Sequence, residues 1–146
     1  MEISMYKEEH FDQVLEIYSR AFSAPPINYT FITPVKAARY VRDITLTPGF
    51  LGYTFWDEQM VAFVFGVLDD YFDGTMFQVK EFAVRSDMHR SGVGTKAMGL
   101  LEAKLSGFNV DAINLNTSRL LPAYGFYRKI GYVEIDENVS LMKWML

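Results

Sequence analysis

The chain has 146 residues, of which 50% are hydrophobic, 16% are aromatic and none is a cysteine. A chain of this length buries about 70% of the surface that it exposes when unfolded, so we expect a single domain over residues 1–146. The net charge of −4 argues against nucleic acid as the main partner, because phosphate backbones call for a basic face. The lack of cysteine excludes disulfides, thiolate zinc sites and a cysteine nucleophile.

The beginning of the chain carries charges where a signal peptide would have an apolar run, and no apolar stretch is long enough to span a membrane. We therefore expect a cytoplasmic protein without a membrane partner. Two histidines, His10 and His89, are too few for a multi-histidine site, so no metal is expected. His10 is expected to be a solvated surface residue.

The first third of the chain predicts a strand followed by two helices. A strand is expected at 2–7, and apolar residues at helical spacing predict a helix over 8–22. Three prolines make residues 23–34 a loop, and a second helix is expected at about 35–44.

Three strand-like runs follow at 50–56, 60–69 and 75–84, and their short polar connections predict an antiparallel meander. A glycine turn and a helix to about residue 105 come next.

The last third predicts a strand at 112–117, a helix at 122–130 and a final hairpin formed by 132–135 and 141–146. The expected fold is therefore of the α/β (α+β) class, with a mixed, mostly antiparallel central sheet flanked by helices.

The turn at residues 89–94 reads HRSGVG and leads directly into a predicted helix. Free backbone N–H groups and the positive end of a helix dipole form an anion site at such a place. Glycine permits backbone angles and close approach that a Cβ would block. A tight turn without any ligand is the alternative interpretation. The groups available to an anion are Arg90, Ser91, Gly92, Gly94 and Thr95.

With this turn and the later segment AYGFYRKIGY, the chain resembles the GNAT superfamily of acyl-CoA-dependent N-acyltransferases. The family pattern [QR]-x-x-G-x-[GA] corresponds to residues 89–94, and its aromatic-Tyr signature corresponds to residues 126–132. His89 departs from this pattern, since Arg or Gln is usual there. Leu120 stands where many members carry an Asn, and Asn116 is a candidate to replace it.

The resemblance implies direct transfer of an acetyl group from acetyl-CoA to a primary amine. The turn would hold the pyrophosphate, and the pantetheine arm would pair with the strand that ends at residues 81–84, a form of strand addition. An N–H group in this stretch would stabilise the oxyanion of the tetrahedral intermediate. The residues expected to bind acetyl-CoA are Phe82, Ala83, Val84, His89, Arg90, Ser91, Gly92, Val93, Gly94, Thr95 and Asn116.

Glu81 is the candidate general base. In an uninterrupted strand it shares a face with Phe77, Val79 and Ala83, and apolar surroundings raise the pKa of a carboxyl group. The alternative is that Glu81 is paired with Lys80 or another cation, or simply solvated.

Tyr127 matches the family position that commonly donates a proton to the leaving thiolate of CoA. The alternative is an ordinary core tyrosine among Phe126, Ile130 and Tyr132, with Tyr124 as a second candidate acid.

The acceptor in this family is usually held by the loop between the first two helices and by the meander turns. Here these segments combine aromatic and acidic residues, which suit an amine cation. The alternative is that the aspartates only form a polar turn. The candidate substrate-binding residues are Tyr29, Phe31, Asp69, Asp70, Tyr71 and Asp73.

Within the superfamily, the chain looks similar to the small-molecule branch, including aminoglycoside-type acetyltransferases. A polyamine, aminoglycoside, amino-acid or peptide amine remains open as the acceptor. A CoA-binding sensor or interaction domain without catalysis and an enzyme that acetylates a protein amine are the other interpretations. A homodimer is expected from family habit alone.

Overall fold

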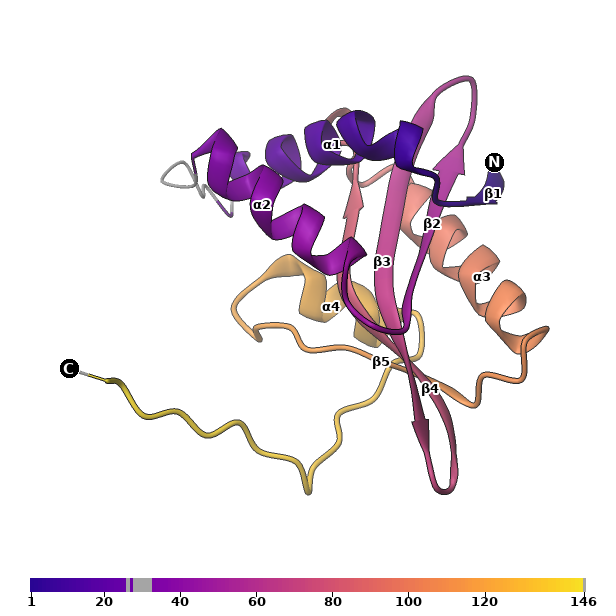
Figure 1. Cartoon of the computed structure of the whole chain (residues 1–146), viewed down its shortest axis with the longest axis vertical. Helices are drawn as coiled ribbons and strands as arrows, with labels where there is room; N and C mark the ends of the chain where they lie inside the picture. The colour runs from indigo at the N-terminus through magenta and orange to yellow at the C-terminus, as the bar shows by residue number, and fades with distance from the viewer. Residues whose placement is uncertain (26, 28–32, 146) are drawn as a thin grey trace. The chain divides into compact units, whose positions relative to one another are not determined.

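The structure is a computed structural model that describes residues 1–25, 27 and 33–145 (Figure 1). These residues form two compact units, Met1–Asn116 and Thr117–Leu146. The predicted acceptor residues Tyr29 and Phe31 lie outside the described residues. The expectation of a single domain stays a prediction.

The first unit is built around a five-stranded sheet in the order β1-β2-β3-β4-β5. The first four strands are antiparallel neighbours, and β5 pairs with β4 in parallel. This confirms the predicted mixed, mostly antiparallel sheet. In chain order the elements are β1 (Glu2–Met5), α1 (Phe11–Ser23), α2 (Pro34–Thr45), β2 (Phe50–Trp56), β3 (Met60–Tyr71), β4 (Gly74–Val84), α3 (Val93–Ser106) and β5 (Ala112–Asn114).

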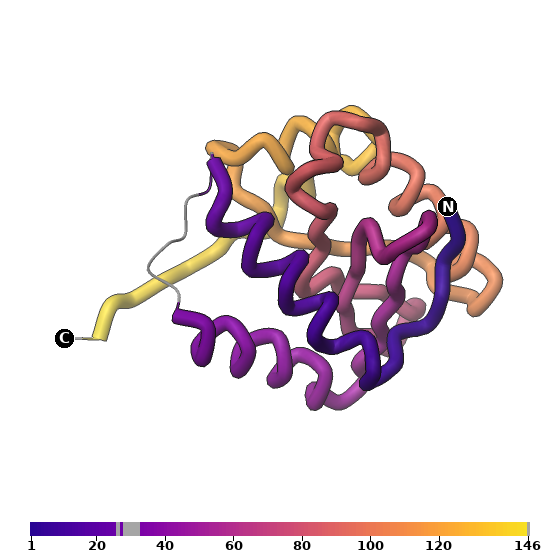
Figure 2. Tube along the Cα trace, turned by 90° about the horizontal axis from the view of Figure 1, so that it is seen from above, coloured from indigo at the N-terminus to yellow at the C-terminus, as the bar shows by residue number. Residues whose placement is uncertain are grey.

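Helices cover both faces of this sheet. The helices α1 and α2 lie on one face and α3 lies on the other, as the view from above shows (Figure 2). The central strand β3 is therefore buried continuously from Met60 to Val67, as expected for a strand covered on both sides. The helical residues that pack on the sheet are Val14, Ile17, Tyr18 and Ala21 of α1, Ala37, Val41 and Ile44 of α2, and Ala97, Met98, Leu101 and Leu105 of α3.

A β-bulge interrupts β4 where it pairs with β3. Phe65 lies opposite Glu81, whereas the next residue, Gly66, lies opposite Val79, so Lys80 is an extra residue. Such an insertion reverses the alternation of side chains along the strand. The prediction that Glu81 shares a face with Phe77 and Val79 is therefore wrong. Glu81 instead lies on the face that α1 and α2 cover.

The side chain of His10 is buried, so the prediction that it is a solvated surface residue is wrong. Its ring packs against those of Trp56 and Tyr6, with centroids 5.4 and 6.2 Å away. Its Nδ1 accepts a hydrogen bond from the backbone N–H of Lys7 at 3.1 Å, which replaces a bond to water just before α1 begins.

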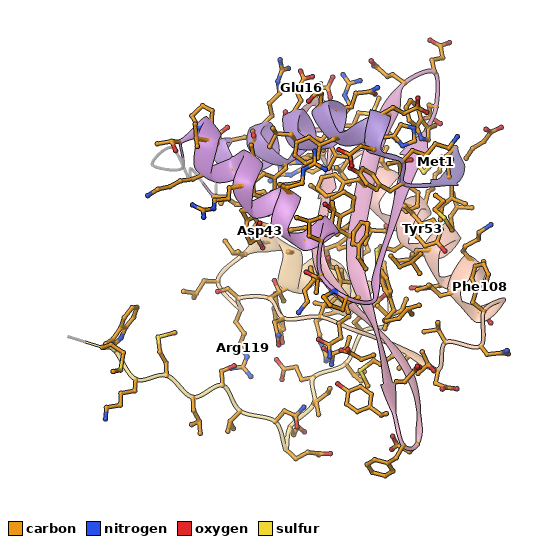
Figure 3. The ribbon with its side chains drawn as sticks, in the orientation of Figure 1. Met1, Glu16, Asp43, Tyr53, Phe108 and Arg119 are labelled. Atoms are coloured by element: carbon orange, nitrogen blue, oxygen red, sulfur yellow. The ribbon has the colours of Figure 1, made fainter. Side chains whose placement is uncertain are left out.

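Tyr53 lies on β2 (Figure 3). It is fully buried, and its hydroxyl has no hydrogen-bond partner among the described residues. A buried polar group without a partner costs about 1–3 kcal/mol. We therefore expect Tyr53→Phe to raise the free energy of unfolding by about 1 kcal/mol. Urea unfolding of the two proteins measures this difference, and a destabilised variant would mean that the hydroxyl has a partner.

The second unit contains α4 (Pro122–Lys129), which ends as predicted before Gly131 at a positive φ of 103°. An ion pair joins Arg119 to Glu134 at 3.1 Å, and the hydroxyl of Tyr124 donates to the same carboxylate at 2.9 Å. Glu134 thus ties the segment after α4 to the segment before it.

The predicted final hairpin is not present, because residues 132–145 contain no strand. A turn forms at residues 136–137, within the expected connection 136–140, but the two flanking segments are not paired as far as the structure describes them. A two-stranded hairpin is marginally stable in water unless it packs against other strands. The apolar side chains of Leu141, Met142 and Trp144 are accordingly exposed.

Candidate functional site

The predicted anion turn follows β4 and a short 3-10 turn (Ser86–Met88), and it opens α3. Arg90 and Gly92 both have left-handed backbones, with φ of 62° and 83°. Gly92 is the N-cap and supplies no capping side chain, so the first N–H groups of α3, at residues 93–95, are left without a cap. Successive N–H groups in such a turn, at the positive end of a helix, form a concave site for an anion.

Two side chains of the turn are engaged inside it. The Nε2 of His89 lies 2.9 Å from the carbonyl oxygen of Val84, so the ring donates to the end of β4 when this nitrogen carries the proton. The hydroxyl of Ser91 donates to the carbonyl of Met88. Arg90 is exposed and makes the charge of the turn positive on its outer side.

The end of β4 that leads to this turn has no neighbouring strand on its β5 side in the described part of the chain. The strand β5 pairs with β4 only from Met76 to Gln78, and no described strand continues this pairing toward Val84. Beyond Gln78, β4 therefore has no neighbouring strand on its β5 side among the described residues, and an extended ligand can add to such an edge as a strand does. The predicted binding residues Phe82, Ala83 and Val84 all lie in this stretch of β4, where Ala83 pairs with Phe63 of β3.

The Glu81 carboxylate lies on the same stretch of β4, and its residue is half-buried. Its Oε1 accepts a hydrogen bond from the hydroxyl of Tyr40, on α2, at 2.6 Å. Burial raises the pKa of Glu81 to about 7, and the bond from Tyr40 acts in the opposite direction. No ion pair joins Glu81 to a cation in the described part of the chain, and Lys80 is exposed at the bulge.

Sequence reasoning missed Tyr40. Its only signal is its place beside the buried stripe of α2, next to Val41 and one turn after Ala37. Nothing in the sequence links position 40 with position 81, because contact between them depends on how α2 crosses the sheet.

The predicted acceptor residues on the meander lie at the tip of the β3–β4 hairpin. Asp69 is four residues along β3 from the partner of Glu81, which is about 13 Å for an extended strand. Asp70 already accepts a hydrogen bond from the hydroxyl of Thr75 at 2.8 Å, and the hydroxyl of Tyr71 accepts one from Gln78 at 3.0 Å. Asp73 is exposed in the turn itself. The structure does not bring these side chains to Glu81.

Tyr127 lies in α4, in the second unit. Its side chain is buried, and its ring meets those of Phe126 and Tyr132 edge to face, with centroids 5.1 and 5.4 Å away. Asn116 is exposed just after β5, and Leu120 is exposed just before α4.

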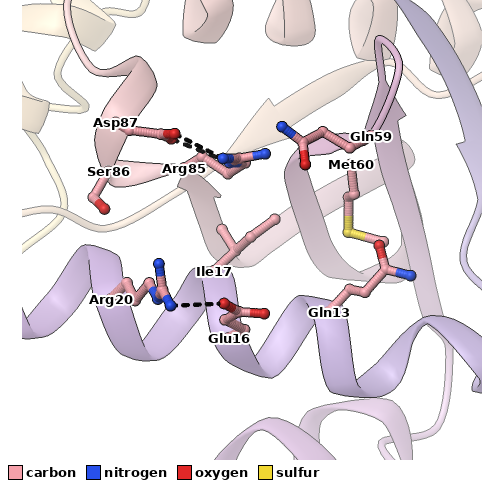
Figure 4. A pocket seen from close by; sticks show the side chains of 9 residues that line it. All are labelled: Gln13, Glu16, Ile17, Arg20, Gln59, Met60, Arg85, Ser86 and Asp87. Atoms are coloured by element: carbon pink, nitrogen blue, oxygen red, sulfur yellow. Dashed lines mark hydrogen bonds and ion pairs between the residues drawn. The ribbon is translucent and has the colours of Figure 1, made fainter.

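A separate pocket of about 200 Å³ lies between α1, the β2–β3 turn and the segment after β4 (Figure 4). Its charged side chains are paired with one another. Arg20 binds Glu16 at 3.0 Å and Arg85 binds Asp87 at 2.7 Å. These pairs leave the pocket without the excess positive charge that a polyphosphate requires.

Among the described residues, no cluster of three or more histidine, aspartate or glutamate side chains is arranged to hold a metal ion. None of the described helices has the length and apolar character needed to cross a bilayer.

The chain matches the family model for the acetyltransferase (GNAT) family over residues 11–132. No curated protein sequence matches the chain. Among solved structures, a possible acetyltransferase from Clostridium difficile is similar, with a TM-score of 0.79 and 12% identity over 99% of this chain and 98% of that one.

Two aminoglycoside acetyltransferases are also similar. The 6'-N-acetyltransferase from Acinetobacter haemolyticus, without ligand, has a TM-score of 0.71 at 16% identity, over 99% of each chain. An enzyme from an uncultured soil metagenomic sample, in complex with sisomicin, has a TM-score of 0.72 at 15% identity, over 99% of this chain and 95% of that one.

Proposed function

Because the chain belongs to the GNAT acetyltransferase family, we propose that it moves an acetyl group from acetyl-CoA to a primary amine of a small molecule. One observation carries the proposal. The part of β4 beyond Gln78, which has no strand neighbour on its β5 side among the described residues, leads to the uncapped turn at 89–95, and the half-buried side chain of Glu81 lies on that same part of β4.

The residues present fit acetyl-CoA. The N–H groups of Val93, Gly94 and Thr95 suit the pyrophosphate, with Arg90 adding a positive charge. The pantetheine arm is an extended chain with amide groups, which suits the backbone of β4 at residues 82–84, where no described strand pairs on the β5 side. When bound, acetyl-CoA supplies the activated acetyl group.

Groups of the protein then accept and donate the protons of the reaction. Glu81 accepts a proton from the acceptor ammonium, directly or through a water, so that the neutral amine can attack the thioester carbon. A backbone N–H on the β4 edge donates to the developing oxyanion. The C–S bond breaks, and Tyr127 donates a proton to the CoA thiolate, in accord with its match to the family motif.

The acceptor is an amine that carries further positive charge. Asp69 lies toward the turn of the β3–β4 hairpin, so a second cationic group of an elongated acceptor would meet it there. The similar soil enzyme in complex with sisomicin, an aminoglycoside, supports acceptors of this kind.

An acetyl-transfer assay tests the function. The full chain is mixed with acetyl-CoA and a panel of aminoglycosides, polyamines, amino acids and basic peptides, and free thiol is followed. Turnover with a small amine supports the proposal. Turnover with peptides alone would favour a protein-modifying enzyme, and binding of acetyl-CoA without any turnover would favour a CoA sensor.

A negative charge placed at Gly92 tests whether the pyrophosphate binds at this turn. Gly92 has a left-handed backbone, which Asn and Asp tolerate better than other residues, and a side chain there meets open space. Gly92→Asp and Gly92→Asn therefore differ mainly in charge. We expect the Asp variant to bind acetyl-CoA at least tenfold, or about 1.4 kcal/mol, more weakly than the Asn variant, as measured by calorimetric titration. Equal affinities for the two variants would place the pyrophosphate elsewhere.

A further inference from the structure

The side chain of Tyr40 reaches from α2 to the sheet at the place where Glu81 stands. The buried residues of α2, Ala37, Val41 and Ile44, hold the helix against the sheet. Tyr40 borders this stripe. It remains 44% exposed, so its ring is not a core side chain in the ordinary sense, although its hydroxyl meets Oε1 of Glu81 at 2.6 Å.

Two features fix where this hydroxyl points. The start of α2 is capped by Thr33, whose hydroxyl accepts the N–H of Lys36 at 3.2 Å. The ring of Tyr40 packs against that of Tyr18, on α1, with centroids 5.7 Å apart, and Tyr18 in turn packs against Phe22 at 4.8 Å. The ring of Tyr18, which packs against Phe22, thus restricts the position of the Tyr40 ring.

The hydrogen bond is of the strong kind. An O–H group that donates to an ionised carboxylate forms bonds of about 2.5–2.7 Å, roughly twice as strong as those between neutral groups. The bond engages Oε1, and no other hydrogen bond to the Glu81 carboxylate is found within the described ranges. Oε2 is therefore left for proton transfer.

We propose that Tyr40 is a positioning residue for acetyl transfer: its hydroxyl holds Oε1 of Glu81 and presents Oε2 to the acceptor ammonium. This inference rests on the proposed function. It adds that α2 controls the orientation and the proton state of the base, so that the pH range of the reaction depends on a residue outside β4.

The other groups around Glu81 do not compete for this role. From β3 the facing residue is Phe65, which carries no charge. From α1, Tyr18 contacts the ring of Tyr40 and raises the pKa of Tyr40. Lys80 is exposed at the bulge of β4. Burial raises the pKa of Glu81, and Tyr40 is the group that holds it down.

The variant Tyr40→Phe tests the inference, because it removes the hydroxyl and keeps the ring against Tyr18. We expect the acid limb of kcat/KM to move up by about one pH unit. The activity then falls about tenfold at about pH 6, and less than threefold at about pH 9. A purely structural role would lower activity equally at every pH.

Tyr6→Phe is the matched control. It also removes one tyrosine hydroxyl, which bonds to Glu8 at 3.5 Å on the surface. This variant should keep the acid limb of the unaltered protein. A shift of equal size in both variants would overturn the inference.

Carbon-13 NMR of the Glu81 carboxyl group, assigned with Glu81→Gln, gives a readout besides activity. We expect its titration midpoint to lie higher in Tyr40→Phe than in the unaltered chain. If the unaltered chain transfers acetyl groups and neither the acid limb nor this midpoint moves, the inference alone is overturned. If the unaltered chain transfers none, the proposed function fails and the inference fails with it.

Discussion

Replacing Glu81 by Gln is expected to lower kcat by about 10²–10³-fold, because general-base catalysis typically contributes about 10²–10⁴-fold. The amide keeps an oxygen that accepts the Tyr40 hydrogen bond, so the local packing is preserved. The KM for acetyl-CoA should not change, since the side chain of Glu81 does not bind the cofactor in this account. Steady-state kinetics with the best acceptor of the panel measure both constants.

The residual activity of Glu81→Gln should rise with pH up to the pKa of the acceptor amine, because free amine then forms without the base. A loss of less than threefold at neutral pH would remove Glu81 from the reaction. A loss that affects KM for acetyl-CoA instead of kcat would mean that Glu81 serves binding.

The same variant has a pH-dependent effect on stability. Burial raises the pKa of Glu81 from 4.5 to about 7, so the ionised carboxylate destabilises the folded protein. This cost is absent below about pH 4.5, grows as the pH rises, and is complete above about pH 7, where it reaches at most about 3 kcal/mol. Glu81→Gln should therefore be more stable than the unaltered chain at about pH 8 but not at about pH 4. Urea unfolding at both values measures this, and a gap that does not depend on pH would contradict it.

Replacing Gly66 by Ala is expected to destabilise the first unit by about 3 kcal/mol, at the upper end of the usual cost of overpacking. A Cβ at Gly66 would lie 2.3 Å from Cζ of Phe77 and 2.6 Å from the backbone oxygen of Gln78. The second contact cannot be relieved by a rotamer change, because it involves backbone. The strands would have to separate at the bulge that directs Glu81.

Gly99→Ala is the matched control, since a Cβ there meets nothing within 4 Å and Gly99 lies inside α3. Alanine is favoured over glycine in a helix by about 1 kcal/mol, so this variant should be more stable. Denaturant unfolding of both variants gives the two free energies. If Gly66→Ala cost no more than Gly99→Ala, the close contact of β3 and β4 at the bulge would be refuted.

Much of the fold could be predicted because the relevant signals are local. The amphipathic spacing in α1 and the polar turns between β2, β3 and β4 define these elements without reference to the rest of the chain. The turn at Gly92 was equally visible, because its small residues and the following helix are contiguous.

The features that escaped prediction depend on contacts between distant residues. The extra residue Lys80 places the side chain of Glu81 on the other face of the sheet. A prediction from the alternation of residues along a strand cannot detect such a bulge. Tyr40 meets Glu81 only through the packing of α2. Two short runs that flank the polar segment 136–140 predict the final hairpin, but strands need partners as well as composition.

The most direct test of the account is a two-dimensional NMR titration of the nitrogen-15 labelled full chain with acetyl-CoA. The account predicts micromolar binding, with the largest shifts at the backbone amides of Phe82 and Val84 on β4 and of Gly94 and Thr95 at the start of α3. Amides of β1, at the other edge of the sheet, should move little. An unchanged spectrum, or shifts confined to the pocket beside Arg20 and Arg85, would contradict it.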